Sequence, residues 1–221
     1  MVLFLHNTSA PPRREVLPDE KYPRLLEQKG FTGVPSLCFM DADGTVVGQP
    51  MRSVRAFAVM NALAKRLLAL RAVGAAATPA EQQERFLVEL QLDLIPGDQI
   101  QAQASAWQLG VFEQALVAQK LVDVEVAAIM QDLRRVRYDD ASFDAARARV
   151  FAMAKAGRTP SATTSGQFWQ LVLEQASRQR DGELAQQAFA ALRARYADEP
   201  SSWLDYRMQD WQQQLAAAQE K

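Results

Sequence analysis

The sequence predicts a chain that is α+β at its start and mainly α over the rest of its length. The first 50 residues hold more than half of the prolines, between short apolar runs, which is typical of strands joined by turns. From Ser53 onward, Ala, Leu, Gln, Arg and Glu predominate and apolar residues recur three and four positions apart, which is typical of amphipathic helices. A small-residue stretch at 74–78 separates the two patterns, so we expect one domain at 1–74 and another at 75–221.

The first domain is expected to form a β-α-β-β-α unit. Gly30 is a favourable end for a short helix, and Ser53 is a favourable N-cap for the next one. The segment 41–44 has turn composition between two apolar runs, which predicts a β-hairpin. The expected elements are a strand at 2–6, a helix at 20–29, a strand ending at 40, a strand at 45–48 and a helix at 53–73.

The second domain is expected to consist of stacked antiparallel helical hairpins. Residues 78–81 form a capping-box sequence with proline at the first helical position, so a helix begins there. Short connections favour antiparallel neighbours. Residues 183–189 are similar to the second helix of a tetratricopeptide repeat, but no 34-residue period is present, so we favour irregular hairpins. Further helices are expected at 99–119, 122–136, 142–156, 164–180, 183–196 and 202–219, with Asp181 and Ser201 as N-caps.

The composition excludes several classes of function. With 25 basic and 26 acidic residues, the chain has no charge excess that would favour nucleic acid or a membrane surface. One cysteine and one histidine are too few for a disulfide or a zinc site, so we expect no metal and no cofactor. No signal peptide or membrane-spanning run is seen, which makes a cytoplasmic location the default expectation.

No catalytic residue is predicted. Cys38 lies in an apolar run, which raises rather than lowers the pKa of a thiol, so we expect it to be structural. His6 is the one side chain suited to acid–base work near neutral pH, but no nucleophile-elbow sequence accompanies it. A glycine-rich loop for binding phosphate is absent as well.

Residues 29–47 resemble the C-terminal half of a thioredoxin domain. The resemblance rests on the loop Gly33, Val34, Pro35 and Ser36, on the apolar strand that follows and on the turn at 41–44. It implies a thioredoxin fold in which Pro35 is the family's cis-proline and the loop borders a partner-binding groove. The strand–helix unit that carries the family's CxxC motif is absent, so the resemblance implies a binding surface without redox activity.

The missing strand lies, in that family, between the strands that match 2–6 and 36–40. Three outcomes are open: segment 2–6 moves beside the hairpin, another chain fills the gap, or the native product begins upstream of Met1. The last two imply a dimer or a longer protein, because unpaired strand edges favour pairing with another strand.

The main functional hypothesis is a non-catalytic thioredoxin-like protein whose helical region binds another protein or a second copy of itself. Trp203, Tyr206 and Trp211 are spaced to lie broadly on one face of a helix, where they pack in the core or, where exposed, contact a partner. Two alternatives are a fragment of a thioredoxin-family disulfide oxidoreductase whose CxxC half lies upstream of Met1, and an enzyme that uses carboxylates in a helical cleft.

Overall fold

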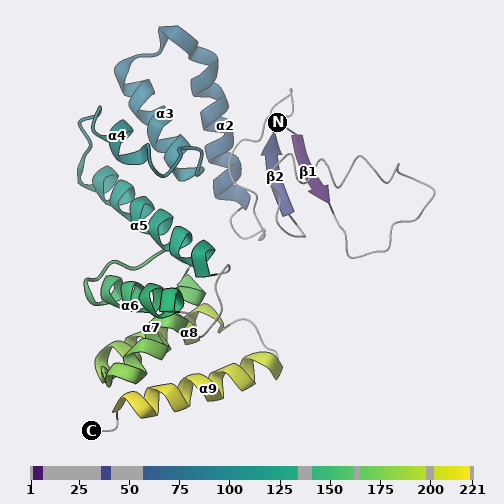
Figure 1. The fold of residues 1–221 in the computed structure, drawn as a ribbon. Coiled ribbons are helices and arrows are strands. Elements are labelled where there is room, and N and C mark those ends of the chain that lie inside the picture. The colour runs from purple at the N-terminus through teal and green to yellow at the C-terminus, as the bar shows by residue number, and fades with distance from the viewer. Residues whose placement is uncertain are drawn as a thin grey trace, which may run out of the picture. The chain divides into compact units, whose positions relative to one another are not determined.

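The structure is a computed structural model that describes residues 2–6, 36–40, 57–133, 141–161, 165–197 and 202–219. The chain divides into two compact units, residues 1–113 (unit 1) and 114–221 (unit 2). Figure 1 shows that the described segments from residue 57 onward are helical. The domain boundary predicted after residue 74 falls inside unit 1.

The strands of unit 1 form a two-stranded antiparallel sheet. β1 (Val2–His6) pairs with β2 (Ser36–Met40), so that Val2 lies opposite Met40 and His6 lies opposite Ser36. This is the first of the three outcomes, in which the N-terminal strand moves beside the second strand. The predicted helix at 20–29 and the predicted strand at 45–48 lie outside the described residues.

The prediction of a partial thioredoxin-like β-α-β-β-α unit is wrong, because the described residues are overwhelmingly helical and contain no such unit. In the thioredoxin sheet a further strand separates the two strands that β1 and β2 match. Here the two strands are hydrogen-bonded to each other, so no further strand lies between them. The fold class of the described chain is therefore mainly α.

A helical hairpin in unit 1 forms around a small core of its own. α2 (Phe57–Val73) packs against α3 (Pro79–Gln91) across a short 3₁₀ turn, η2 (Gly74–Ala76). Gly74 has a φ of +61°, a left-handed conformation that suits glycine and ends α2. The predicted capping box is confirmed, since the Thr78 hydroxyl accepts from the Glu81 N–H while Glu81 accepts from the Thr78 N–H. The buried core residues shared by this hairpin are Ala64, Leu67, Leu70, Val88 and Leu92.

The next two helices differ from the predicted ones. α4 (Ile100–Ala104) is short, and α5 (Val111–Leu133) runs without a break through positions 120–121, where the sequence predicted a gap between two helices. The break falls instead at residues 105–110. At its end the Gly110 N–H donates to the Glu113 carboxylate at 2.8 Å, just before α5 begins. Positions 120–121 contain no glycine or proline, so nothing local stops the helix there.

Unit 2 is a packed set of helices that continues from α5. α6 (Ala141–Lys155), α7 (Ser165–Gln179), α8 (Gly182–Arg195) and α9 (Ser202–Gln219) match the predicted helices to within about two residues. α7 packs against α6, α8 and α9, and α8 also packs against α9. The helical hairpin arrangement predicted for this region is confirmed. Asp181 is the N-cap of α8, as predicted, whereas Ser201 lies outside the described residues.

Charged groups join α5 to α6 and to the segment after α6. Glu125 on α5 accepts hydrogen bonds from Arg149, at 2.6 Å, and from Arg158. Together these bonds lower the pKa of the Glu125 carboxyl, with the bond from Arg149 as the largest cause. Asp123 accepts from the backbone N–H of Ser161 at 2.6 Å. This side of unit 2 is thus held by ion pairs rather than by apolar packing alone.

Candidate interaction cleft

A cleft lies in unit 1, where α2, η2, α3 and α4 come together. Its volume is about 380 Å³ and it is open to solvent. The turn at Gly74 and the short length of α4 place side chains from four segments around it. The lining residues are Leu70, Gly74, Ala77, Glu81, Gln82, Arg85, Phe86, Glu89, Gln103, Ala106 and Trp107.

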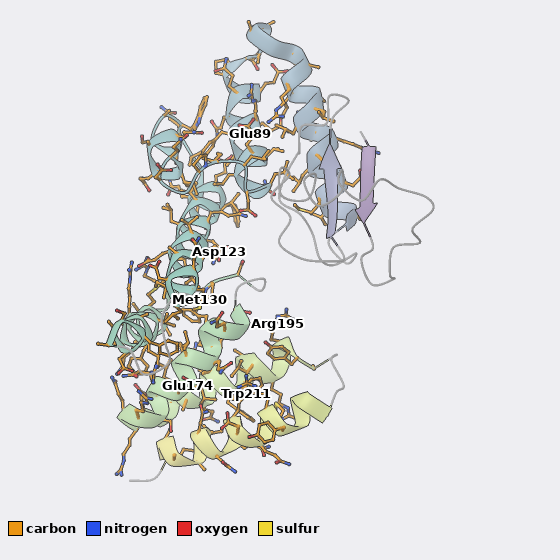
Figure 2. The ribbon with its side chains drawn as sticks, turned by 45° about the vertical axis from the view of Figure 1, so that its right-hand side comes forward. Glu89, Asp123, Met130, Glu174, Arg195 and Trp211 are labelled. Atoms are coloured by element: carbon orange, nitrogen blue, oxygen red, sulfur yellow. The ribbon has the colours of Figure 1, made fainter. Side chains whose placement is uncertain are left out.

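α3 supplies the charged wall of the cleft. Glu81, Arg85 and Glu89 lie four residues apart, so they follow one another along one side of the helix. Oε1 of Glu89 accepts from Nε of Arg85 at 3.0 Å and from Arg71, which is not a lining residue, at 3.4 Å. Figure 2 labels Glu89 on this helix. The charge of Glu89 is therefore balanced within the protein before any ligand binds.

Glu81 is ionised at neutral pH. Hydrogen bonds from the backbone N–H and then from the hydroxyl of Thr78 lower the pKa of its carboxyl. Both bonds, each 2.8 Å long, use the same carboxylate oxygen, Oε2. The capping box that begins α3 thus also fixes a negative charge at one end of the cleft.

Two aromatic residues supply the apolar part of the cleft. Phe86 on α3 lines the cleft and is only 4% exposed, whereas Trp107 lines it and is partly exposed. The Trp107 backbone N–H donates to the carbonyl of Ala104 at 3.2 Å, which holds the residue in the turn that ends α4. Trp107 is therefore partly accessible to a group bound in the cleft.

A second, smaller cleft lies in unit 2 at the start of α8. Its volume is about 280 Å³, and it is lined by Lys155, Asp181, Glu183 and Gln187 with two apolar neighbours. Lys155 and Asp181 form an ion pair at 3.0 Å, and Asp181 also accepts the N–H of Leu184 at 3.2 Å. The pair of Lys155 and Asp181 joins α6 to the start of α8, so we assign this cleft a structural role.

The three aromatics predicted as possible interface residues do not share one environment. Trp211, labelled in Figure 2, is 1% exposed and packs in the core of unit 2. Its ring centroid lies 5.7 Å from that of Tyr196. Tyr206 is 72% exposed. Five residues turn a helix by about 140°, which places these two side chains on different sides of α9. The side chain of Trp203 lies outside the described part of the structure.

The predicted partner-binding loop at 33–36 lies mostly outside the described residues. Gly33, Val34 and Pro35 lie there, whereas Ser36 begins β2. Cys38 is paired with Phe4 in the sheet register. No group of three or more His, Cys, Asp or Glu side chains among the described residues could hold a metal ion.

Sequence reasoning missed the cleft in unit 1. It weighed aromatics in the last quarter of the chain and did not single out Trp107. The available signal was local: a tryptophan followed within three residues by Gly110, which marks a turn next to helices. Which residues then face Trp107 depends on how α2, α3 and α4 pack.

Comparison with known proteins adds no relative, because no protein-family model, curated protein or solved structure matches the chain. Among the described helices, none combines the length and the apolar character that crossing a bilayer requires.

Proposed function

We propose that the helical region of this chain is a protein-interaction module, which binds a segment of another polypeptide in the cleft of unit 1. The observation that supports this most directly is the cleft itself, an open hollow of about 380 Å³ between helices of one hairpin and the short helix that follows. Packed helical hairpins present concave surfaces of this kind to peptides and helices. The proposal assigns the cleft binding and no chemical step.

The chemistry of the lining favours a polypeptide. Gln82 and Gln103 bring side-chain amides, which pair with the N–H and C=O groups of a peptide backbone. Phe86 and Trp107 bring aromatic surface, and tryptophan is among the residues that contribute most to binding at interfaces. A peptide offers backbone polar groups and side chains together, which matches this mixture of amide and aromatic groups. Binding of a second copy of the chain stays a prediction.

The proposal is tested by selecting peptides from a random library displayed on phage, with the full chain as bait. We expect selected peptides to bind wild type and to bind Trp107→Ala at least about tenfold more weakly, because the indole that lines the cleft is removed. Phe112→Ala is the matched control, since it removes an exposed aromatic that does not line the cleft and should leave affinity unchanged.

Circular dichroism of both variants verifies that the helices are intact. Peptides that bind Trp107→Ala as tightly as wild type would refute the cleft as the binding site. A selection that returns no peptide above background would count against the proposed function itself.

A further inference from the structure

We infer that the cleft of unit 1 receives an uncharged amide side chain, a glutamine or an asparagine, of the partner polypeptide. The inference rests on the proposed function, because it names the residue type that the same cleft recognises. Two features of the lining support it. Its charges are already balanced within unit 1, and its unused hydrogen-bonding atoms include both donors and acceptors.

The charged groups at the cleft are balanced by partners within the α2–α3 hairpin. Oε1 of Glu89 accepts hydrogen bonds from both Arg85 and Arg71. After the hydrogen bonds of the capping box, which are the larger causes, the charge of Arg66 also lowers the pKa of the Glu81 carboxyl. Three carboxylates thus lie among three guanidiniums: Glu81, Glu84 and Glu89 with Arg66, Arg71 and Arg85. A charged side chain that enters the cleft would lose part of its hydration without meeting an unbalanced opposite charge.

The hydrogen-bonding atoms of the lining that the described residues leave unused are of both kinds. The acceptors are the side-chain oxygens of Gln82 and Gln103, whose nitrogens donate within the protein at 2.9 and 3.2 Å, and the second oxygen of each lining carboxylate. The donors are the indole N–H of Trp107 and the terminal nitrogens of Arg85, which bonds through Nε. A carboxamide carries two donors and one acceptor without a net charge, so it can use both kinds. Guanidinium and ammonium groups lack an acceptor and a carboxylate lacks a donor, so each would leave one kind unpaired.

The size of the cleft suits one side chain with the backbone that carries it. At about 380 Å³, its volume is near the lower end of the range for clefts that hold small molecules. Leu70, Phe86 and Trp107 add apolar surface to the lining, against which the methylene groups of an amide side chain can pack. Both parts of such a side chain, the polar end and the apolar stem, therefore find complementary groups in one cleft.

The experiment uses the peptides selected with the full chain, in which we expect one glutamine or asparagine position to be required. At that position the amide residue is replaced by its acid, by lysine and by methionine. These replacements add a negative charge, add a positive charge or remove the hydrogen-bonding groups. We expect each to weaken binding about tenfold, because a donor or acceptor of the cleft is left unpaired or a charge enters without a partner. A required position that tolerates the acid or lysine would overturn the inference.

The dependence of affinity on salt gives a second readout. Salt screens the attraction between charges, whereas hydrogen bonds between uncharged groups respond little to it. With serine at any other charged position of the peptide, we expect affinity for the full chain to change less than about twofold between about 50 and 500 mM NaCl. A tenfold fall over this range would show that a charged contact dominates and would overturn the inference.

A matched pair of variants tests the place of binding. Gln103→Met removes an amide from the lining, and Gln101→Met removes one from an exposed position of α4 outside the lining. We expect Gln103→Met to weaken the selected peptides about fivefold and Gln101→Met to change their affinity less than about twofold, with both helical spectra unchanged. Equal affinities of the two variants would overturn the inference.

The result also separates this inference from the proposed function. Selected peptides that need Trp107 but contain no required glutamine or asparagine would leave the binding module in place and overturn the amide side chain. Selected peptides that require the amide, and that lose affinity in Trp107→Ala, would support both.

Discussion

Removing the Asp181 side chain is expected to lower the free energy of unfolding of unit 2 by about 1.5 kcal/mol. Asp181 accepts the N–H of Leu184 as the N-cap of α8, and loss of such a cap costs about 1 kcal/mol. It also pairs with Lys155 at 3.0 Å. Because Lys155 is 63% exposed, this ion pair contributes no more than about 0.5 kcal/mol.

Three variants separate these contributions. Asp181→Asn keeps a capping oxygen and loses the charge, so we expect it to lose about 0.5 kcal/mol, whereas Asp181→Ala loses both contributions. Lys155→Met should match Asp181→Asn. The measurement is urea unfolding in a Trp107→Phe background, where all remaining tryptophans lie in unit 2. Equal losses in Asp181→Asn and Asp181→Ala would refute the capping argument.

The same site makes a pH prediction. Hydrogen bonds from Lys155 and then from the Leu184 N–H lower the pKa of the Asp181 carboxyl in the folded state. Its contribution is therefore fully present above the unfolded pKa of about 3.9 and is lost as the pH falls through the lower folded pKa. The stability difference between wild type and Asp181→Asn should be constant from about pH 5 to 8 and should shrink toward pH 2. A difference that does not change over this range would contradict the assignment.

Three further predictions concern packing, backbone conformation and charge in unit 2. Leu192→Ala removes a fully buried side chain from the core and should cost about 3 kcal/mol in the same urea assay; a loss under about 1 kcal/mol would show that the site is not packed. Arg180 has a φ of +54° after α7, so Arg180→Gly should raise the free energy of unfolding by about 0.5 kcal/mol. Gln186→Gly inside α8 should lower it by about 1 kcal/mol. Similar decreases in both variants would refute the conformational argument. Glu125→Gln breaks the pairs with two exposed arginines and should cost about 1 kcal/mol at low salt and less at 1 M NaCl; a cost independent of salt would argue against ion pairing.

The helices of unit 2 could be predicted because their signals are local. The apolar spacing of α6 to α9 and the N-cap at Asp181 each depend on neighbours within a few residues. The capping box at the start of α3 succeeded for the same reason. The gap predicted at 120–121 failed because it was placed by the pattern alone, without a glycine or proline to end the helix.

The β-α-β-β-α unit could not be predicted in this way, because strand pairing joins residues far apart in the chain. His6 lies opposite Ser36 across 29 intervening residues, and no short motif fixes which strands become neighbours. The motif at 33–47 resembles the loop and strand pattern of thioredoxin domains, but it does not specify which strands pair with each other. The cleft of unit 1 escaped prediction for a related reason, since Leu70 and Trp107 meet only through the packing of α2, α3 and α4.

The charged groups around the cleft are balanced or hydrogen-bonded within the protein. Glu89 is balanced by Arg71 and Arg85, and Glu81 is satisfied by the capping box, so the unliganded cleft requires no partner to be stable. Each carboxylate nevertheless keeps one oxygen free of bonds to the described residues. A partner bound as proposed would therefore meet groups that are already held in place. Such preorganisation lowers the ordering cost of binding and favours selection by charge and hydrogen-bond geometry over selection by apolar area.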